Sequence, residues 1–597
     1  MHNPARRASS ALAGTGDRPQ VWQVSNGRVR RAGMLVPVWS LRRDGTQGIG
    51  DTTAVRELVD WAAECGLGFL QLLPINETGV DHSPYNAISS VALEPSLLDL
   101  ALIPQLNSDD FVRARGEVSP EVFTRNLVDY PAVKKLKRGL LEVAFGRFWS
   151  EERESEQGAA FTSFCKEESG WLDLYCKFRW LMTLEGNCET WDLWSMNYNT
   201  AQKAEAWIAE KRAARSAEIE RCLAFPAWIQ WIAYTQWRDL RAYAGSRDVK
   251  LMGDVPIGIS FSSADVFFEG QWFDLQWSGG APPETVFKDD AFAVRWGQNW
   301  GIPLYRWDVL REDNFSWWRR RIEKLTEVFE IFRIDHILGF YRIFSFPWRP
   351  GRNAEFLTLD PEEAKARTGG RLPGFKPHDD DTPEHRAANL AEGDEYLRMV
   401  LEAAGDNKVV GEDLGAVPDY VRPHLLAIGI GGFKICHWEV GEDGVGIEHP
   451  IPGTDYEECS FATFATHDHP PMALMWEGYR SGMETIDEDA REGARWNLRV
   501  LSEFAGIPLA KDADAFPPYD EELQWKLLTA LFETNSRYAA FMITDLFGMT
   551  ERFNVPATVG GANWAVRMLF TVEEMGRRDD LKNEAEKLRI LIHDTRR

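Results

Sequence analysis

The sequence predicts an α/β fold: a single (β/α)8 TIM barrel with large, mainly helical insertions at the C-terminal face of the barrel. Two observations predict it. From Gly33 onward, short apolar stretches typical of buried strands alternate with amphipathic helical stretches. Several apolar stretches are also followed directly by an acidic residue or a histidine. This is expected of a parallel barrel, because its active site forms at the mouth, the end where the carboxyl ends of all strands lie.

The first elements follow a mobile or loosely attached tail, expected at residues 1–32, where Arg, Ala, Gly and Ser show little periodicity. The barrel then extends over residues 33–597. Its first strand is expected in MLVPVWSL and its second in FLQLLPI. Between them we expect a helix from Thr53 to Cys65, with Thr53 as its N-cap. Gly66 and Gly68 permit the left-handed turn that ends this helix.

Two insertions interrupt the alternation. Long helical stretches fill about 96–245, and a second insertion, including the acidic loop PHDDDTPEH, occupies about 345–400. Between and after them the strand pattern resumes, in VKLMGDVPIGI, VFEIFRIDHIL, NKVVGEDLG and CSFATFATHDH.

Composition excludes several classes of function. With 67 basic and 92 acidic residues, the net charge of −25 repels nucleic acid and anionic membrane surfaces. The longer apolar runs fall well short of the roughly 18 residues that a membrane span needs. Seven scattered cysteines without CxxC spacing and an N-terminus without a signal-type apolar core indicate a cytoplasmic protein.

Four acidic residues occupy equivalent positions where predicted strands end: Asp254, Asp335, Glu412 and Asp468. Carboxylates that converge on one barrel mouth suit retaining glycoside chemistry, which needs a nucleophile and an acid/base with a raised pKa. Arg333, two residues before Asp335, is expected on the same side of its strand, where it could keep that aspartate ionised.

Two other readings of these residues exist. Acidic residues at strand ends also serve as helix caps or as partners of arginine. A metal site is conceivable because His336, His467, Asp468 and His469 supply ligand types, but no HExxH or similar spacing is present. We therefore expect no metal and no cofactor.

An ordered series of motifs resembles glycoside hydrolase family 77, the amylomaltases or disproportionating enzymes, from about Gly33 to Arg567. The motifs are LPINETGVDHSPYNAISSVALEP, GDVPIGISFSSADVF, APPETVF, GQNWGIPLYRW, FRIDHILGF, GEDLG, ATHDH and RFNVPATVGGANW. The departures from the family pattern are local: Ser262, Glu284, Ala557 and Val566. Ser262 and Glu284 do not touch the acid/base pair, and Ala557 and Val566 concern the expected shape of the acceptor side.

The resemblance implies a role for seven residues. It implies Asp335 as nucleophile, Glu412 as general acid/base, and Asp468 as the carboxylate that stabilises the transition state. It further implies substrate binding by Tyr85, as a stacking platform for the sugar at the cleaved linkage, and by Asp254, Arg333 and His467 around it. Each has a physical rationale, because aromatic faces stack on sugar rings and charged groups bind hydroxyls.

The implied activity is that of a retaining 4-α-glucanotransferase acting on maltooligosaccharides and α-1,4-glucans. An α-amylase-like hydrolase would use the same residues and differ only in whether water outcompetes the acceptor sugar. A catalytically silent glucan-binding protein is the alternative from another class. The joint presence of Asp335, Glu412 and Asp468 argues against a silent binder, since binding alone needs no acid with a raised pKa.

Overall fold

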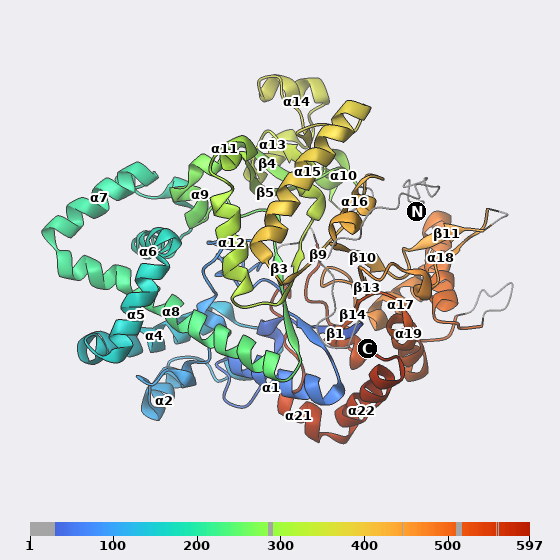
Figure 1. Ribbon diagram of the computed structural model, residues 1–597, viewed down its shortest axis with the longest axis horizontal. Helices are drawn as coiled ribbons and strands as arrows, with labels where there is room; N and C mark the ends of the chain where they lie inside the picture. Colours follow the sequence, from blue (N-terminus) through green and yellow to red (C-terminus); the bar gives the residue numbers. More distant parts are fainter. Residues whose placement is uncertain (1–29, 285–289, 444–445, 509–515, 557, 559) are drawn as a thin grey trace.

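The computed structural model describes residues 30–597 except 285–289, 444–445, 509–515, 557 and 559. Residues 1–29 of the expected tail, part of the APPETVF segment and Ala557 therefore lie outside the described residues. In the described part, eight parallel strands close into a barrel in the order β1-β14-β13-β10-β9-β6-β3-β2, which confirms the predicted fold (Figure 1). These strands are β1 (Arg31–Leu35), β2 (Phe69–Gln71), β3 (Lys250–Val255), β6 (Ile331–Ile334), β9 (Lys408–Gly411), β10 (Gly431–Ile435), β13 (Ser460–Thr463) and β14 (Tyr538–Met542).

Large apolar side chains fill the barrel interior. Phe69, Phe433, Phe461 and Tyr538 pack together there, with Phe433 stacked on Phe461 at 4.6 Å between ring centroids. A Cβ on Gly33 would lie 2.2 Å from the ring of Phe69, so the glycine leaves the space that this ring occupies. The interior is thus a packed core that supports the mouth above it.

The first barrel helix, α1 (Thr52–Cys65), corrects one expectation. Its N-cap is Asp51, whose side chain accepts a hydrogen bond from the Ala54 N–H, and Thr53 lies inside the helix. Asp51 takes the cap because its backbone is extended while the residues after it are helical. Gly66 ends the helix at φ 84°, the left-handed conformation that was predicted.

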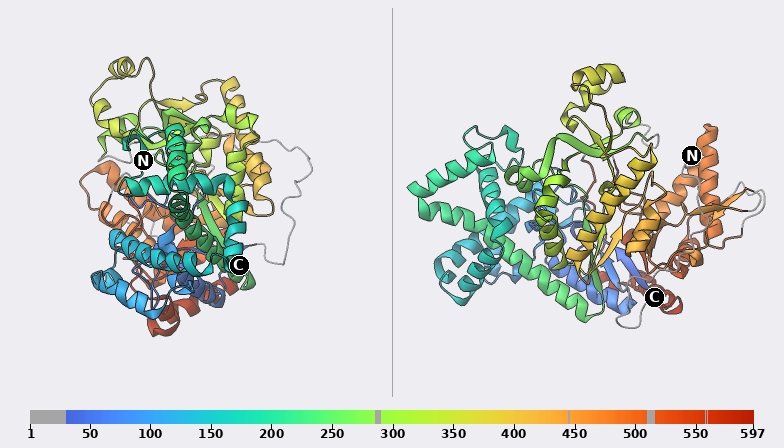
Figure 2. Two further views of the ribbon diagram at one scale, coloured as in Figure 1. Left: turned by 90° about the vertical axis from the view of Figure 1, so that its left-hand side faces the viewer. Right: turned by 45° about the horizontal axis from the view of Figure 1, so that its top comes forward.

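Helices cover the outside of the barrel, and two groups of helices extend it sideways (Figures 1 and 2). On the outside lie α12 (Ser316–Thr326), α15 (Pro383–Ala404), α16 (Val421–Ile428), α19 (Glu521–Glu533), α21 (Val572–Arg577) and α22 (Asp579–Asp594). The crossover from β10 to β13 differs, because its described residues form a hairpin of β11 (Val440–Glu442) and β12 (Glu448–Pro450) in place of an α-helix. Beyond β13, α17 (Met472–Gly482) packs on α18 (Glu488–Phe504) at the right of Figure 1.

The long segment between β2 and β3 is helical, as expected. It contains α2 (Ser108–Gly116), α3 (Glu121–Thr124), α4 (Tyr130–Arg147), α5 (Glu156–Glu167), α6 (Ser169–Leu184), α7 (Ala201–Ala214) and α8 (Ser216–Ser246). These helices form the left side of Figure 1. The end of α8 contacts α1 and β3, so the same helix belongs to the insertion at its start and to the barrel wall at its end.

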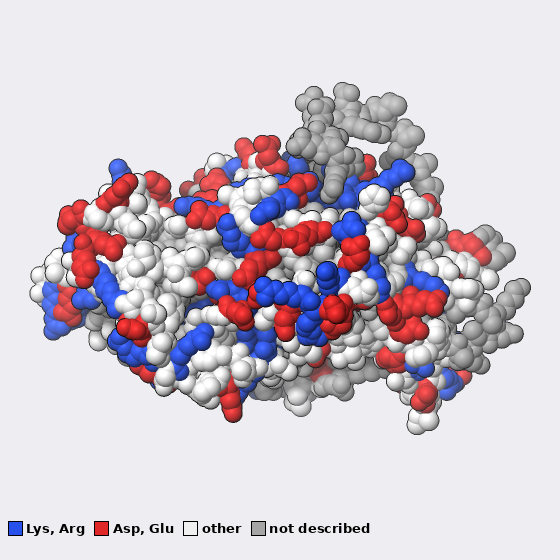
Figure 3. Space-filling model, turned by 90° about the horizontal axis from the view of Figure 1, so that it is seen from below, with Lys and Arg blue, Asp and Glu red and all other residues white. Residues whose placement is uncertain are grey.

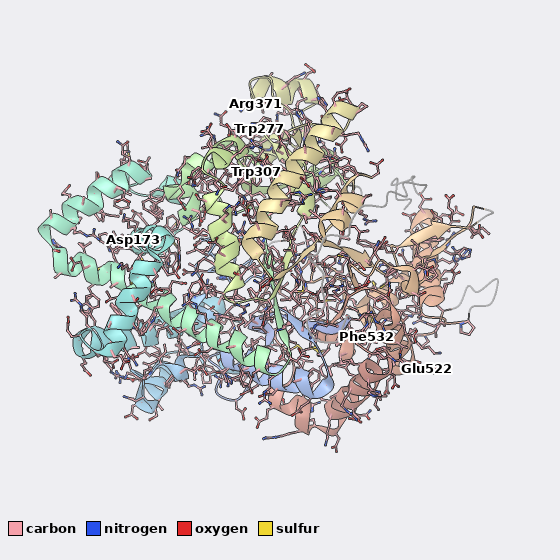
Figure 4. All side chains as sticks on the ribbon, viewed as in Figure 1. Asp173, Trp277, Trp307, Arg371, Glu522 and Phe532 are labelled. Carbon is pink, nitrogen blue, oxygen red and sulfur yellow. The ribbon has the colours of Figure 1, made fainter. Side chains whose placement is uncertain are left out.

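A second sheet, antiparallel and four-stranded, was not predicted. Its order is β5-β4-β7-β8, with β4 (Phe273–Ala281), β5 (Gln298–Tyr305), β7 (Ile343–Phe346) and β8 (Gly374–Lys376). Between Asp274 and Ser278 the register shifts, and Trp277 lies in this irregular stretch with the Arg371 guanidinium 5.6 Å from its ring (Figure 4). The neighbouring helices are α9 (Ala264–Phe268), α10 (Ala291–Trp296), α11 (Trp307–Glu312), α13 (Asn353–Phe356) and α14 (Pro361–Arg367).

The described surface carries both signs of charge despite the net charge of −25. On the face seen in Figure 3, described Lys and Arg side chains are interspersed with Asp and Glu. In the described part of the chain, no helix is both long and apolar enough to cross a membrane.

Candidate active site

A fully buried arginine forms the centre of the barrel mouth. Arg333, near the end of β6, donates one Nη to Asp254 Oδ2 at 2.5 Å. Its other Nη lies 2.8 Å from Asp335 Oδ1 and 3.0 Å from Glu412 Oε1. The register explains this meeting, because Arg333 pairs with Asp254 on β3, while Asp335 and Glu412 directly follow the paired ends of β6 and β9.

The carboxyl groups of Asp335 and Glu412 lie close together, since both contact the same nitrogen of Arg333. Glu412 Oε2 also accepts the backbone N–H of His336 at 2.8 Å. His336 adopts φ 45° and ψ 54°, a left-handed conformation that non-glycine residues rarely take. This unusual backbone aims the N–H at Glu412, and sequence reasoning did not anticipate it.

Opposing effects set the ionisation of this pair. Burial, followed by the nearby carboxylates, raises the pKa of Asp335 well above its usual value despite the opposing charge of Arg333. Burial also acts to raise the pKa of Glu412, but the charge of Arg333 and the His336 N–H outweigh it and lower this pKa to about 2. Of the two groups, Asp335 therefore binds a proton more tightly than Glu412 in this arrangement, so the raised pKa expected of the acid/base is found on Asp335 and not on Glu412.

Arg333 contacts Asp335, as expected, and its charge acts to lower the pKa of Asp335. Burial and three neighbouring carboxylates outweigh that charge, so the pKa lies well above its usual value. Arg333 itself stays charged: burial acts to lower its pKa, but the carboxylates around it raise that pKa well above its usual value.

Asp468 lies at the same mouth, after β13, and its side chain is about one third exposed. Asn554 donates its side-chain amide to Asp468 Oδ1 at 2.6 Å, and Arg552 donates to the Asp468 carbonyl at 2.7 Å. Both come from the RFNVPATVGGANW segment, whose place in the motif series was noted without a role for these residues. The carboxylate is thus fixed by a loop 84 and 86 residues away in the chain.

Tyr85 and His467 form an aromatic wall beside the carboxylates. Their rings stack at 5.1 Å between centroids and 11° between planes, and the ring of Trp564 lies 5.7 Å from each. The Tyr85 hydroxyl donates to Asp254 Oδ2 at 2.7 Å. Burial lowers the pKa of His467 to about 4, so its imidazole is neutral near pH 7.

Exposure divides the seven expected site residues into two groups. Asp335, Glu412, Asp468 and Tyr85 are partly accessible at the mouth. Asp254, Arg333 and His467 are almost completely buried behind them. The buried three can orient the accessible groups, and Asp254 in particular holds Tyr85 and Arg333.

Metal binding has no geometric support in the described part of the chain, where no three His, Cys, Asp or Glu residues form a group that could hold an ion. His336 instead lies edge-on to Trp300, at 4.9 Å between ring centroids. His469 accepts from the backbone N–H of Thr466.

Comparison with known proteins gives a consistent result. A family model described as 4-alpha-glucanotransferase matches residues 36–571. The chain is 29% identical over 572 residues to the 4-alpha-glucanotransferase of Chlamydia caviae, covering 93% of this chain and 94% of that one. It is 29% identical over 547 residues to the 4-alpha-glucanotransferase of Thermus thermophilus, covering 90% and 95%.

Solved structures share the fold. The amylomaltase of Streptococcus agalactiae, in complex with acarbose, superposes with a TM-score of 0.70 at 24% identity, covering 95% of this chain and 99% of that one. The amylomaltase of Corynebacterium glutamicum gives a TM-score of 0.71 at 21% identity, covering 94% and 75%.

Proposed function

The chain belongs to the 4-alpha-glucanotransferases of glycoside hydrolase family 77, and on this premise we propose that it moves segments of α-1,4-glucan between maltooligosaccharides, or to glucose, through a covalent glycosyl-aspartate on Asp335. Glu412 is the general acid/base and Asp468 the third carboxylate of this proposal. No metal or cofactor takes part in it.

One observation carries the mechanism: Asp335 and Glu412 share a single nitrogen of buried Arg333. Retaining enzymes have their two carboxyl groups only about 5–5.5 Å apart, whereas inverting enzymes leave about 6.5–9.5 Å for a water. Because one oxygen of Asp335 lies 2.8 Å and one oxygen of Glu412 lies 3.0 Å from that same nitrogen, the two oxygens are closer together than an inverting arrangement requires. The spacing supports a retaining double displacement.

The first displacement needs a proton on Glu412. The pKa of Asp335 is raised and that of Glu412 is lowered, so a proton bound by the pair is held more tightly by Asp335 and must move to Glu412 before the glycosidic bond breaks. Glu412 then gives this proton to the glycosidic oxygen while Asp335 attacks the anomeric carbon. The carbon–oxygen bond to the leaving chain breaks, and that chain departs with a free 4-hydroxyl.

The second displacement reverses these steps. The 4-hydroxyl of an acceptor sugar attacks the anomeric carbon, Glu412 takes its proton, and the bond to Asp335 breaks. Two inversions restore the α linkage. The oxocarbenium-like transition state of each step carries positive charge beside Asp468, which Asn554 and Arg552 hold in place.

The proposal is tested by incubating the protein with maltotriose alone and following the products over time. Glucose together with maltopentaose and longer chains is the result that transfer predicts. Glucose and maltose without longer chains would indicate a hydrolase that uses the same residues. Unchanged maltotriose would indicate a protein that only binds glucan.

A first prediction concerns the decrease of kcat/KM at low pH, the acid limb of the pH profile. Burial raises the pKa of Asp254 from 3.8 to about 6, so this carboxylate gains a proton as the pH falls through about 6. The neutral form no longer holds the charge of Arg333 or accepts as strongly from the Tyr85 hydroxyl. We expect kcat/KM for maltotriose to fall below about pH 6.

Protonation of Asp254 does not by itself destabilise the fold. Because the folded protein binds the Asp254 proton more tightly than the unfolded chain does, this group stabilises the fold as the pH falls from about 6 to 3.8. Asp254→Asn is the matched variant, with a permanently neutral side chain. Its kcat/KM should be low throughout and lack the limb near pH 6, and an unchanged limb would contradict the assignment.

A second prediction concerns the platform. Tyr85→Ala removes the stacked ring and should raise the KM for maltotriose by up to about tenfold, since stacking of this kind contributes roughly 0.5–1.5 kcal/mol. The half-buried position predicts only a small loss of thermal stability. Tyr85→Phe keeps the ring and should retain most of the affinity. A large fall in melting temperature with unchanged KM would instead identify Tyr85 as a core residue.

A further inference from the structure

We propose that Tyr130 is a positioning residue for the active site: its hydroxyl fixes Trp564, and Trp564 in turn holds the stacked rings of Tyr85 and His467. The proposal rests on the function proposed above. It adds a residue of the helical insertion, to which no role has been given, to the machinery that orients the sugar platform.

The first contact of this relay joins α4 to the C-terminal loop. Tyr130, the first residue of α4, is 7% exposed, and its hydroxyl donates to the carbonyl oxygen of Trp564 at 2.6 Å. Burial raises the pKa of this hydroxyl well above its usual value, so it remains a donor at any working pH. The two residues are 434 positions apart in the chain.

The backbone of Trp564 needs this support. Its φ is 60°, in the left-handed region where a bulky side chain is strained. A strained residue persists only when its surroundings hold it. Here its N–H donates to the Phe553 carbonyl at 2.9 Å, its carbonyl accepts from Tyr130, and the next carbonyl, that of Ala565, accepts from the Val128 N–H at 2.7 Å.

The second contact joins Trp564 to the platform. Its ring packs at 5.7 Å from both Tyr85 and His467, tilted by 47° and 44°. At its start, the same loop holds Asp468 through Asn554. A shift of Trp564 would therefore move one side of the sugar site against the other, and the hydroxyl of Tyr130 opposes that shift.

Tyr130 is itself held from its other side. The imidazole of His82 stacks on its ring at 4.2 Å between centroids and 14° between planes. Asp129 caps the helix at the same point by accepting the N–H of Ala132. His82 and the helix cap thus hold Tyr130 in place independently of its bond to Trp564, as a positioning residue requires.

The test compares Tyr130→Phe with Tyr234→Phe. Tyr234 is 1% exposed and also donates its hydroxyl to a backbone carbonyl, that of Val91 at 2.9 Å. In the described part of the chain, its hydrogen bond and its ring contacts join it to other residues than the site residues named above. Loss of either hydroxyl leaves a buried carbonyl unpaired, so we expect similar falls in melting temperature. Only Tyr130→Phe should lower kcat/KM for maltotriose, by about tenfold, which is the effect of about 1.4 kcal/mol.

A double-mutant cycle tests the route through Trp564. In a Trp564→Leu background, Tyr130→Phe should cause no further fall in kcat/KM, because the group it positions is already gone. The relay is overturned if Tyr130→Phe retains kcat/KM as the Tyr234→Phe control does, or if its full effect persists in the Trp564→Leu background. Failure of the proposed function looks different, since the wild-type protein would then make no longer chains from maltotriose.

Discussion

Asp335→Asn should abolish turnover, with kcat lower by at least about 10⁴-fold, the order seen when a nucleophile is removed. Asparagine has nearly the same shape and keeps an oxygen that can accept from Arg333, so the mouth should retain its geometry. It cannot form the covalent bond to the anomeric carbon. Oligosaccharide binding, measured by calorimetry with maltotetraose, should therefore change little.

Asp413→Asn is the control for this variant. Asp413 directly follows Glu412 and is buried, but it binds Arg422 and the N–H of Phe433. Its substitution should lower thermal stability while most of kcat remains. Full activity in Asp335→Asn, or equal losses of kcat in both variants, would contradict the role of Asp335.

Glu412→Gln should give a loss that depends on the leaving group. With maltotriose, kcat should fall by about 10²–10⁴-fold, the usual contribution of a general acid/base. With maltosyl fluoride as donor, the leaving group departs without a proton, so the first displacement should recover. Asp335→Asn should show no such recovery, since it lacks the nucleophile in both cases.

The same substitution has a structural cost that must be measured separately. Glu412 accepts the His336 N–H with one oxygen and contacts Arg333 with the other, and glutamine offers only one oxygen. We expect a fall in melting temperature, because one buried donor loses its acceptor. If the fluoride donor is used no better than maltotriose, the loss reflects damaged geometry and Glu412 is not the acid.

The barrel and its mouth could be predicted because both depend on local patterns. Runs such as IFRID join a buried strand to an acidic residue. Because all eight strands of the closed barrel are parallel, the residues that follow them lie at one end of the barrel, independently of the loop conformations; these include Asp254, Asp335, Glu412 and Asp468. The pairing of Arg333 with its neighbours follows from the same register.

Other features depend on contacts between distant segments. In the accessory sheet, β4 and β5 are longer than the barrel strands, but both contain glycine and their pairing has register shifts. Their partners β7 and β8 come from a later part of the chain, so no single stretch shows a strand pattern that sets it apart from a loop. Asn554 and Trp564 reach the site from a loop whose motif was visible but whose partners were not. The raised pKa of Asp335 follows mainly from burial, which a sequence does not report.

The most direct test of the central claim is to trap the intermediate. Glu412→Gln is incubated with maltosyl fluoride, digested, and analysed by mass spectrometry, because slow release should let the glycosyl-enzyme accumulate. The account predicts one maltosyl adduct, on the peptide that contains Asp335. An adduct on another carboxylate, such as Asp254 or Asp468, or efficient turnover without any adduct would contradict it.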